Sequence, residues 1–196
     1  MFPFVSVPHA AQLYVRGQKI VHSQRYMRAI ERNLAELQRA ILNRTTLLGL
    51  EDAGVSHLFL KLAYYALFND YIAHCIKVFE TRKQAASFWY IYRTNQKPID
   101  AYARRNKISI KALETVSEKL KHIRDKTHFH IDETGVLEPK AVWRVADLKG
   151  KELSVAVDGA WGILTELQQS LKLPEVTLPE YDCALVKRLA CLVEEQ

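Results

Sequence analysis

The sequence predicts an all-α fold, a helical bundle that forms a single domain over residues 1–196. Hydrophobic residues make up 48% of the chain and charged residues 26%, while glycine and proline number only 7 and 6. This composition is typical of a folded, helix-rich protein. Apolar residues also recur at i, i+3 and i+4 along much of the chain, as they do in helices that bury one face. We expect the helical core over about residues 10–172 and a last helix over about 180–195.

Two long helices are expected in the N-terminal half. After Pro8, helical patterning runs from about residue 9 to 45, with a kink near Gly17. Turn-forming residues at 51–56 separate it from a second helix, which Ser56 would cap and which would continue to about residue 82. Because this second helix is apolar on nearly every face, we expect it at the centre of the bundle.

Shorter helices are expected afterwards. The aromatic and basic stretch 88–106 contains Pro98, which predicts two short helices with a break between them. An amphipathic helix should cover about 109–130, with Ser109 as its cap. Beyond a turn at 132–139, we expect helices over about 139–148, 151–172 and 181–194, the last one after a linker at 174–180.

Charge and cysteine content limit the kinds of partner and the cellular compartment that the sequence allows. The net charge of +6 and the pI near 9.2 favour an anionic partner such as nucleic acid. Three cysteines without a CxxC pair predict reduced thiols, and the N-terminal residues lack the features of a signal peptide. The most apolar run, 58–79, is interrupted by charged residues, which argues against a membrane span. We therefore expect a cytoplasmic protein that does not enter a membrane.

The densest cluster of chemically useful side chains is RDKTHFHID, residues 124–132. At about 100° per residue, His130 falls about 20° from Ile123 and continues the buried stripe of the amphipathic helix. His128 lies one turn above Arg124, towards the hydrophilic side. Helix geometry therefore favours His130 over His128 as the functional histidine.

Arg124, Asp125 and His130 resemble the signature of the HEPN (higher eukaryotes and prokaryotes nucleotide-binding) superfamily. That signature is an arginine followed by Asn, Asp or His and then by a histidine four to six residues later; here five residues intervene. The continuation to Asp132 is similar to the abortive-infection branch, although Phe129 stands where the family usually has alanine. The resemblance implies a HEPN-like bundle, here with extra C-terminal helices.

The resemblance also implies an activity. Family members of this type are metal-independent endoribonucleases that act in phage defence, abortive infection or toxin–antitoxin systems and need no cofactor. The products would be a 2′,3′-cyclic phosphate and a 5′-hydroxyl. Histidine suits general acid–base work and arginine suits phosphate, so His130 would be the base or acid and Arg124 the phosphate clamp. Asp125 would orient one of them or polarise the site, and partners would be RNA and an antitoxin protein.

Helix geometry sets a constraint on this site. Arg124 and His130 lie about 120° apart around an ideal helix and about 9 Å apart along it, so they do not converge from one straight helix. Either the helix frays at Thr127–His130 or a second subunit supplies its own motif. The family resemblance implies the second arrangement, a cleft at a homodimer interface.

Two other patterns have a functional and a structural interpretation. On the second helix a polar stripe of Asp70, His74, Lys77 and Thr81 would line the same cleft or, as we favour, form an internal network with the basic surface of the first helix. His128 and Asp132 are further candidates for the lining of the cleft. The basic stretch 93–111 carries Tyr102 and follows Tyr90 and Tyr92, and cations beside aromatic rings suit single-stranded RNA, while Phe88 and Trp89 suit the core. Its candidate RNA-binding residues are Arg93, Lys97, Arg104, Arg105 and Lys107.

Two alternatives to a ribonuclease remain open on the sequence. His122, His128, His130 and Asp132 are close in sequence, but HxH on a helix splays its ligands and no HExxH pair is present, so we expect no metal. The stronger alternative is a non-catalytic HEPN module that binds RNA or a nucleotide, or that regulates as a dimer. Cleavage assays with Arg124→Ala and His130→Ala would separate these classes.

Overall fold

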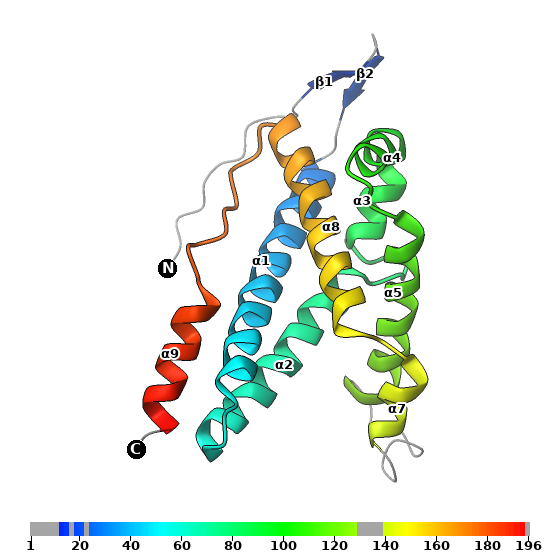
Figure 1. Cartoon of the computed structure of the whole chain (residues 1–196). Helices are drawn as coiled ribbons and strands as arrows, with labels where there is room; N and C mark the ends of the chain where they lie inside the picture. Colours follow the sequence, from blue (N-terminus) through cyan, green and yellow to red (C-terminus); the bar gives the residue numbers. More distant parts are fainter. Residues whose placement is uncertain (1–11, 16–17, 22–23, 129–138, 195–196) are drawn as a thin grey trace.

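The computed structural model describes residues 12–15, 18–21, 24–128 and 139–194, which form an α-helical bundle with a small β-hairpin at one end (Figure 1). The long helix α1 (Gln24–Ala53) packs against α2 (Leu58–Val78), α3 (Phe88–Thr94), α8 (Gly150–Ser170) and α9 (Cys183–Glu194). On the other side stand α4 (Gln96–Arg105), α5 (Ile110–Ile123) and α7 (Pro139–Ala146). The all-α prediction is confirmed.

The hairpin replaces the expected start of the first helix. Strands β1 (Gln12–Val15) and β2 (Gln18–Val21) pair antiparallel, with Gln12 opposite Val21 and Val15 opposite Gln18. The prediction of a helix from residue 9 is therefore wrong, and α1 begins at Gln24 and runs past residue 45 to Ala53. The sequence carries the hairpin signal, since β-branched residues flank a two-residue Arg-Gly connection.

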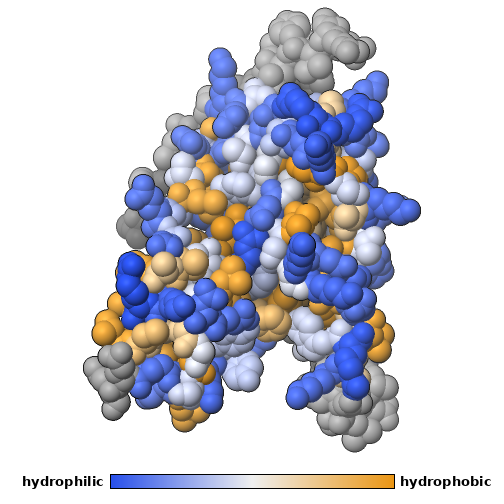
Figure 2. Space-filling model, in the orientation of Figure 1, coloured by the Kyte–Doolittle hydropathy of each residue, from blue (hydrophilic) through white to orange (hydrophobic). Residues whose placement is uncertain are grey.

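Helix α2 is less central than its composition suggests. Its second half is buried, but Leu58, Phe59, Leu62 and Tyr65 in its first half are 60 to 70% exposed. Apolar side chains on the described surface are visible at this end of the molecule, where α1, α2 and α9 meet (Figures 1 and 2). The cap is His57 and not Ser56: the His57 ring accepts a hydrogen bond from the Phe59 N–H, while Ser56 donates to Glu194 of α9.

The remaining elements follow the pattern of the sequence closely. The break between α3 and α4 falls at Asn95, and Pro98 lies in the first turn of α4, where a missing N–H costs nothing. Ser109 caps α5 as expected, accepting a hydrogen bond from Ala112 N–H at 3.2 Å. Helices α7, α8 and α9 begin and end within about two residues of their predicted bounds.

One large hydrophobic core unites α1, α2, α3, α5 and α8, and a smaller cluster around Leu50 and Val186 attaches α9 to α1. Phe88 lies in the large core, and so does Trp89, whose indole N–H donates to Ser117 at 2.9 Å. Cys75, Cys183 and Cys191 are free thiols, as predicted. Among the described residues, no helix is long and apolar enough to cross a membrane.

Gly49 should be required for docking of α9. A Cβ at this position would lie 2.7 Å from both the Cys183 carbonyl oxygen and Val186 Cβ, closer than real Cβ contacts come. Alanine normally favours a helix over glycine by about 1 kcal/mol, but we expect Gly49→Ala to destabilise the protein and to expose the 171–182 linker to proteolysis. Urea denaturation and limited proteolysis would measure both effects. Gly150→Ala is the control, because nothing lies within 4 Å of its Cβ, and equal behaviour of the two variants would contradict the prediction.

Candidate functional site

The motif lies where α5 changes from an α-helix to a π-helical turn. Helix α5 buries Leu113, Val116, Leu120 and Ile123 as predicted, but it ends at Ile123 and continues as the π-helical turn η1 (Arg124–His128). The Thr127 hydroxyl donates to the Ile123 carbonyl oxygen at 2.7 Å, in competition with the regular helical bond to that carbonyl. The prediction of a regular helix to residue 130 is therefore wrong, and with it the straight-helix geometry between Arg124 and the histidines.

Arg124 is a buried cation held by two carboxylates. Its side chain is only 7% exposed. Its Nε and Nη2 donate to Asp125 Oδ1 at 2.8 and 2.6 Å, and its Nη1 donates to Glu80 Oε2. Glu80 follows the C-terminal end of α2, so this arginine joins the ends of two helices that are distant in sequence.

The pKa values around this cluster reflect the opposition of burial and pairing. Burial alone would lower the pKa of Arg124, but its hydrogen bonds to Glu80 and Asp125 outweigh that effect and raise it. Burial alone would raise the pKa of Glu80, but the hydrogen bond from Arg124, a backbone hydrogen bond from Arg82 and both positive charges lower it. The cluster is therefore ionised at neutral pH.

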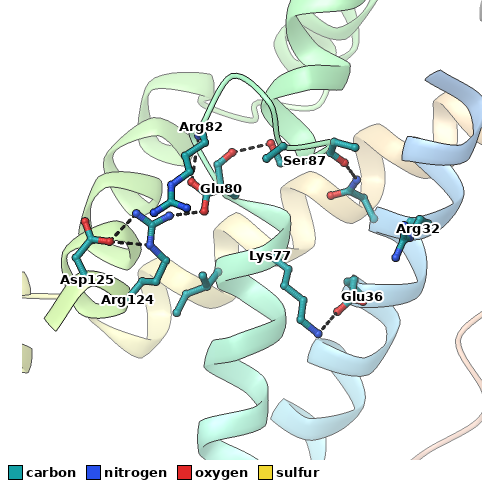
Figure 3. Close-up of a pocket in the computed structure, with 12 residues that line it drawn as sticks. Arg32, Glu36, Lys77, Glu80, Arg82, Ser87, Arg124 and Asp125 are labelled. Carbon is teal, nitrogen blue, oxygen red and sulfur yellow. Dashed lines mark hydrogen bonds and ion pairs between the residues drawn. The ribbon is translucent and has the colours of Figure 1, made fainter. Parts of the chain in front are cut away.

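The loop from Phe79 to Ser87 forms one wall beside this cluster and is fixed by hydrogen bonds. The Ser87 hydroxyl donates to the Glu80 carbonyl oxygen at 2.6 Å, and the Arg82 backbone N–H donates to Glu80 Oε1 at 3.0 Å. From α1, the buried Asn33 amide donates to the Ala86 carbonyl oxygen at 2.7 Å. These bonds anchor both ends of the loop, so Glu80 and Arg82 are held in place around Arg124 (Figure 3).

Between this loop, α1, α2 and η1 lies an open pocket of about 570 Å³ (Figure 3). Its charged lining residues are four cations and three carboxylates: Arg32, Lys77, Arg82, Arg124, Glu36, Glu80 and Asp125. Its uncharged lining comes mainly from Asn33, Ile76 and Ser87. The motif arginine therefore shares a polar pocket with side chains from three other parts of the chain.

Beside the pocket, the polar stripe of α2 pairs with α1. His74 is 4% exposed, and its Nδ1 and Nε2 lie 2.5 Å from Glu36 Oε2 and 3.1 Å from Asp70 Oδ2. Lys77 donates to Glu36 at 3.1 Å, and Asn43 donates to Asp70 at 2.8 Å. The stripe thus forms a network with α1, but with Glu36 and Asn43 and not with the basic surface we expected.

The predicted cleft residues divide between the pocket and its surroundings. Arg124, Asp125 and Lys77 line the pocket. Asp70 and His74 do not line it; they belong to the adjoining network, in which His74 pairs with the pocket residue Glu36. Thr81 lies beyond the end of α2. The side chain of His128 and the whole of His130 and Asp132 fall outside the described residues.

The basic segment forms a separate surface. Arg93, Lys97, Arg104, Arg105 and Lys107 are all exposed, and none of them lines the pocket that holds Arg124. Arg105 covers the Tyr102 ring at 5.3 Å and pairs with Glu166 at 3.3 Å, while the Tyr92 hydroxyl donates to Asp100 at 3.0 Å. The Arg25 guanidinium lies 5.4 Å from the centre of the Tyr90 ring, and the Tyr92 ring stacks on Phe88, so each of the three tyrosine rings contacts a neighbour in the protein.

Sequence reasoning did not identify Arg32, Glu36, Glu80 or Arg82 as site residues. Glu80 carried a weak signal, because it is an acidic residue directly after a long apolar run. Arg32 and Glu36 lie one turn apart on α1 and read as ordinary surface residues. Within the described part of the chain, no group of three or more His, Cys, Asp or Glu side chains could hold a metal ion.

Comparison with protein-family models, with curated proteins and with solved structures gives no match to this chain.

The two partners of Arg124 should differ in their contribution to stability. Removing one partner of a buried ion pair typically costs 3–5 kcal/mol, whereas exposed pairs contribute up to about 1 kcal/mol. The Glu80 side chain is 15% exposed and that of Asp125 is 45% exposed. We expect Glu80→Ala to lower the free energy of unfolding by roughly 3 kcal/mol and Asp125→Ala by about 1 kcal/mol or less. Urea denaturation would measure both, and a larger loss for Asp125→Ala would contradict the arrangement.

The lowered pKa values of Glu80 and Glu36 predict acid sensitivity. Both are ionised in folded and unfolded chains at neutral pH, so the stabilisation is complete above the ordinary value of 4.5. Below it, the unfolded chain binds protons first, and stability falls until the folded carboxylates also protonate. Glu80→Gln should flatten this fall in denaturation measured at several pH values. Glu118→Gln, which removes a side chain that is 58% exposed, should leave it unchanged, and an unchanged slope in Glu80→Gln would refute the prediction.

Proposed function

We propose that this protein is a metal-independent endoribonuclease of HEPN type that acts in phage defence or in a toxin–antitoxin system. The observation that carries the proposal is the position of Arg124 and Asp125: they occupy a π-helical turn at the end of α5 and line a polar pocket rich in cations. π-helical turns are rare in proteins, and many of those that do occur lie at functional sites. The resemblance of residues 124–130 to the HEPN signature supplies the reaction type.

The proposed chemistry needs a base, an acid and a stabiliser of the phosphorane. His130 acts as base or acid: the base removes the proton of the 2′-hydroxyl, the 2′-oxygen attacks phosphorus, and the bond to the 5′-oxygen breaks as the protonated His130 of the same or of the second subunit gives that oxygen a proton. This leaves a 2′,3′-cyclic phosphate and a 5′-hydroxyl. Arginine has five N–H donors, and three of those of Arg124 are used by Glu80 and Asp125. Two donors remain for the phosphate oxygens.

The proposal includes a homodimer in which two copies of the motif form one cleft. Monomeric proteins rarely expose large contiguous apolar patches, and such patches often mark interaction sites. The first half of α2 exposes Leu58, Phe59, Leu62 and Tyr65, and this supports association with another chain, a second copy or an antitoxin protein. The basic side chains from Arg93 to Lys107 would bind RNA by charge alone, since their tyrosines are engaged elsewhere.

A second candidate function is a non-catalytic module that binds RNA or a nucleotide. The observation that favours it is the near-complete burial of Arg124 between two carboxylates, an arrangement that also serves stability alone. In this version the arginine joins α2 to α5 and the exposed cations bind the ligand. The two candidates differ in whether His130 has a chemical role.

Replacement of His130 should abolish RNA cleavage without loss of the fold. Loss of a general base or acid typically costs 10²–10⁴-fold in rate, so we expect His130→Ala to cleave at least about 100-fold more slowly than wild type. His128→Ala is the matched control and should cleave at nearly the wild-type rate. The assay uses labelled RNA with and without EDTA, with detection of cyclic-phosphate ends and thermal unfolding of each variant.

Three outcomes would count against the proposal. Wild type that binds RNA but never cleaves it would favour the non-catalytic module. Equal loss in His128→Ala and His130→Ala would remove the assignment of the base. Full cleavage by a protein that sediments as a single 22.6 kDa chain would overturn the two-motif cleft.

A further inference from the structure

Some of the charged side chains that line the Arg124 pocket form ion pairs and others do not. Glu36 pairs with His74 and Lys77, and Glu80 and Asp125 both pair with Arg124. All three carboxylates and two of the four cations are therefore already used. Among the described residues, the guanidinium groups of Arg32 and Arg82 neither donate a hydrogen bond nor form an ion pair, although the charge of Arg82 helps to lower the pKa of Glu80.

Arg124 itself is a weak attractor of anions. One guanidinium between two carboxylates leaves that cluster with a net charge of −1 at neutral pH. The attraction that brings an anionic ligand into the pocket must therefore come from other side chains. Arg32 and Arg82 are exposed, line the pocket and carry charge that no described carboxylate neutralises by direct pairing.

The two arginines lie on separate walls. Arg32 belongs to α1 and Arg82 to the loop after α2, and Figure 3 shows them at opposite sides of the pocket, with Glu80 and Lys77 between them. The loop is anchored by the hydrogen bonds of Ser87 and Asn33, so Arg82 projects from a fixed backbone. Guanidinium groups bind phosphate through two parallel donors.

We propose that Arg32 and Arg82 form a phosphate-binding pair that guides a single RNA strand across the mouth of this pocket. A chain that crosses from α1 to the loop presents more than one phosphate, so each arginine takes one. A single strand fits a pocket of about 570 Å³ better than a duplex, whose bases are paired and whose two strands are wound around each other. The inference rests on the proposed function for the choice of RNA, and it names residues outside the motif.

The test measures binding separately from cleavage. The probe is a single-stranded oligonucleotide with 2′-O-methyl groups, which lacks the attacking hydroxyl, and binding is followed by fluorescence anisotropy at several salt concentrations. Arg32→Gln/Arg82→Gln is compared with Arg39→Gln/Lys83→Gln. The control removes the same charge from exposed side chains of the same two elements, outside the pocket.

We expect the Arg32/Arg82 variant to bind about tenfold more weakly or worse at low salt, with the control close to wild type. For single strands the salt dependence of log K changes by about 0.7 per phosphate contact, so loss of two contacts should reduce the slope by about 1.4. Arg32→Lys/Arg82→Lys should recover most of the slope. Thermal unfolding checks the fold, which these exposed, unbonded side chains should not affect.

The outcomes separate the two proposals. Binding lost in the Arg32/Arg82 variant, with no RNA cleavage by wild type, supports the phosphate pair and refutes the ribonuclease. Cleavage of RNA by wild type with equal binding by both double variants supports the ribonuclease and overturns the pair. The proposal that Arg32 and Arg82 guide an RNA strand is also overturned if wild type binds inorganic phosphate as tightly as the oligonucleotide, or if it binds neither.

Discussion

The buried guanidinium of Arg124 is the constraint on which the arrangement of the site depends. A cation that is 7% exposed is stable only with hydrogen-bonded partners, and here these are Glu80 after α2 and Asp125 in the turn itself. Because Glu80 is also held by the backbone of Arg82 and by the loop to Ser87, the end of α5 is positioned against the end of α2. Loop, pocket and motif are thus one connected structure.

A second polar network holds the opposite wall. His74 lies between Glu36 and Asp70, and its Nδ1 and Nε2 lie 2.5 and 3.1 Å from their carboxylate oxygens. Its hydrogen bond to Glu36 joins α2 to α1, and Lys77 shares the same carboxylate. Burial alone would raise the pKa of Glu36, but these bonds lower it. The charges on this wall are therefore neutralised internally, which leaves Arg32 exposed and unpaired.

The sequence predicts most of the local helical structure but not the long-range pairs. The Ser109 cap and the stripe of α5 follow from spacing, and the stretch 88–106 was correctly divided in two. The hairpin was not predicted because strands of only four residues are too short for their periodicity to be told from that of a helix, and the β-branched residues were the only signal. Glu80 and Arg124 are 44 positions apart, and only the packing of α2 against α5 brings them together. The π-helical turn, in which the Thr127 hydroxyl donates to the Ile123 carbonyl oxygen, is not encoded by hydrophobic periodicity.

In the proposed ribonuclease, the pairing of Arg124 with Glu80 and Asp125 would also divide the tasks in the pocket between separate cations. An arginine fixed by two carboxylates does not reorganise when charge develops beside it, and that rigidity is what electrostatic stabilisation of a transition state requires. The same carboxylates cancel its long-range attraction for an anion. A site built this way needs separate cations to attract the ligand. Four cations against three carboxylates leave the pocket with a net charge of +1, and the unpaired cations are those at its walls, Arg32 and Arg82, not at the clamp.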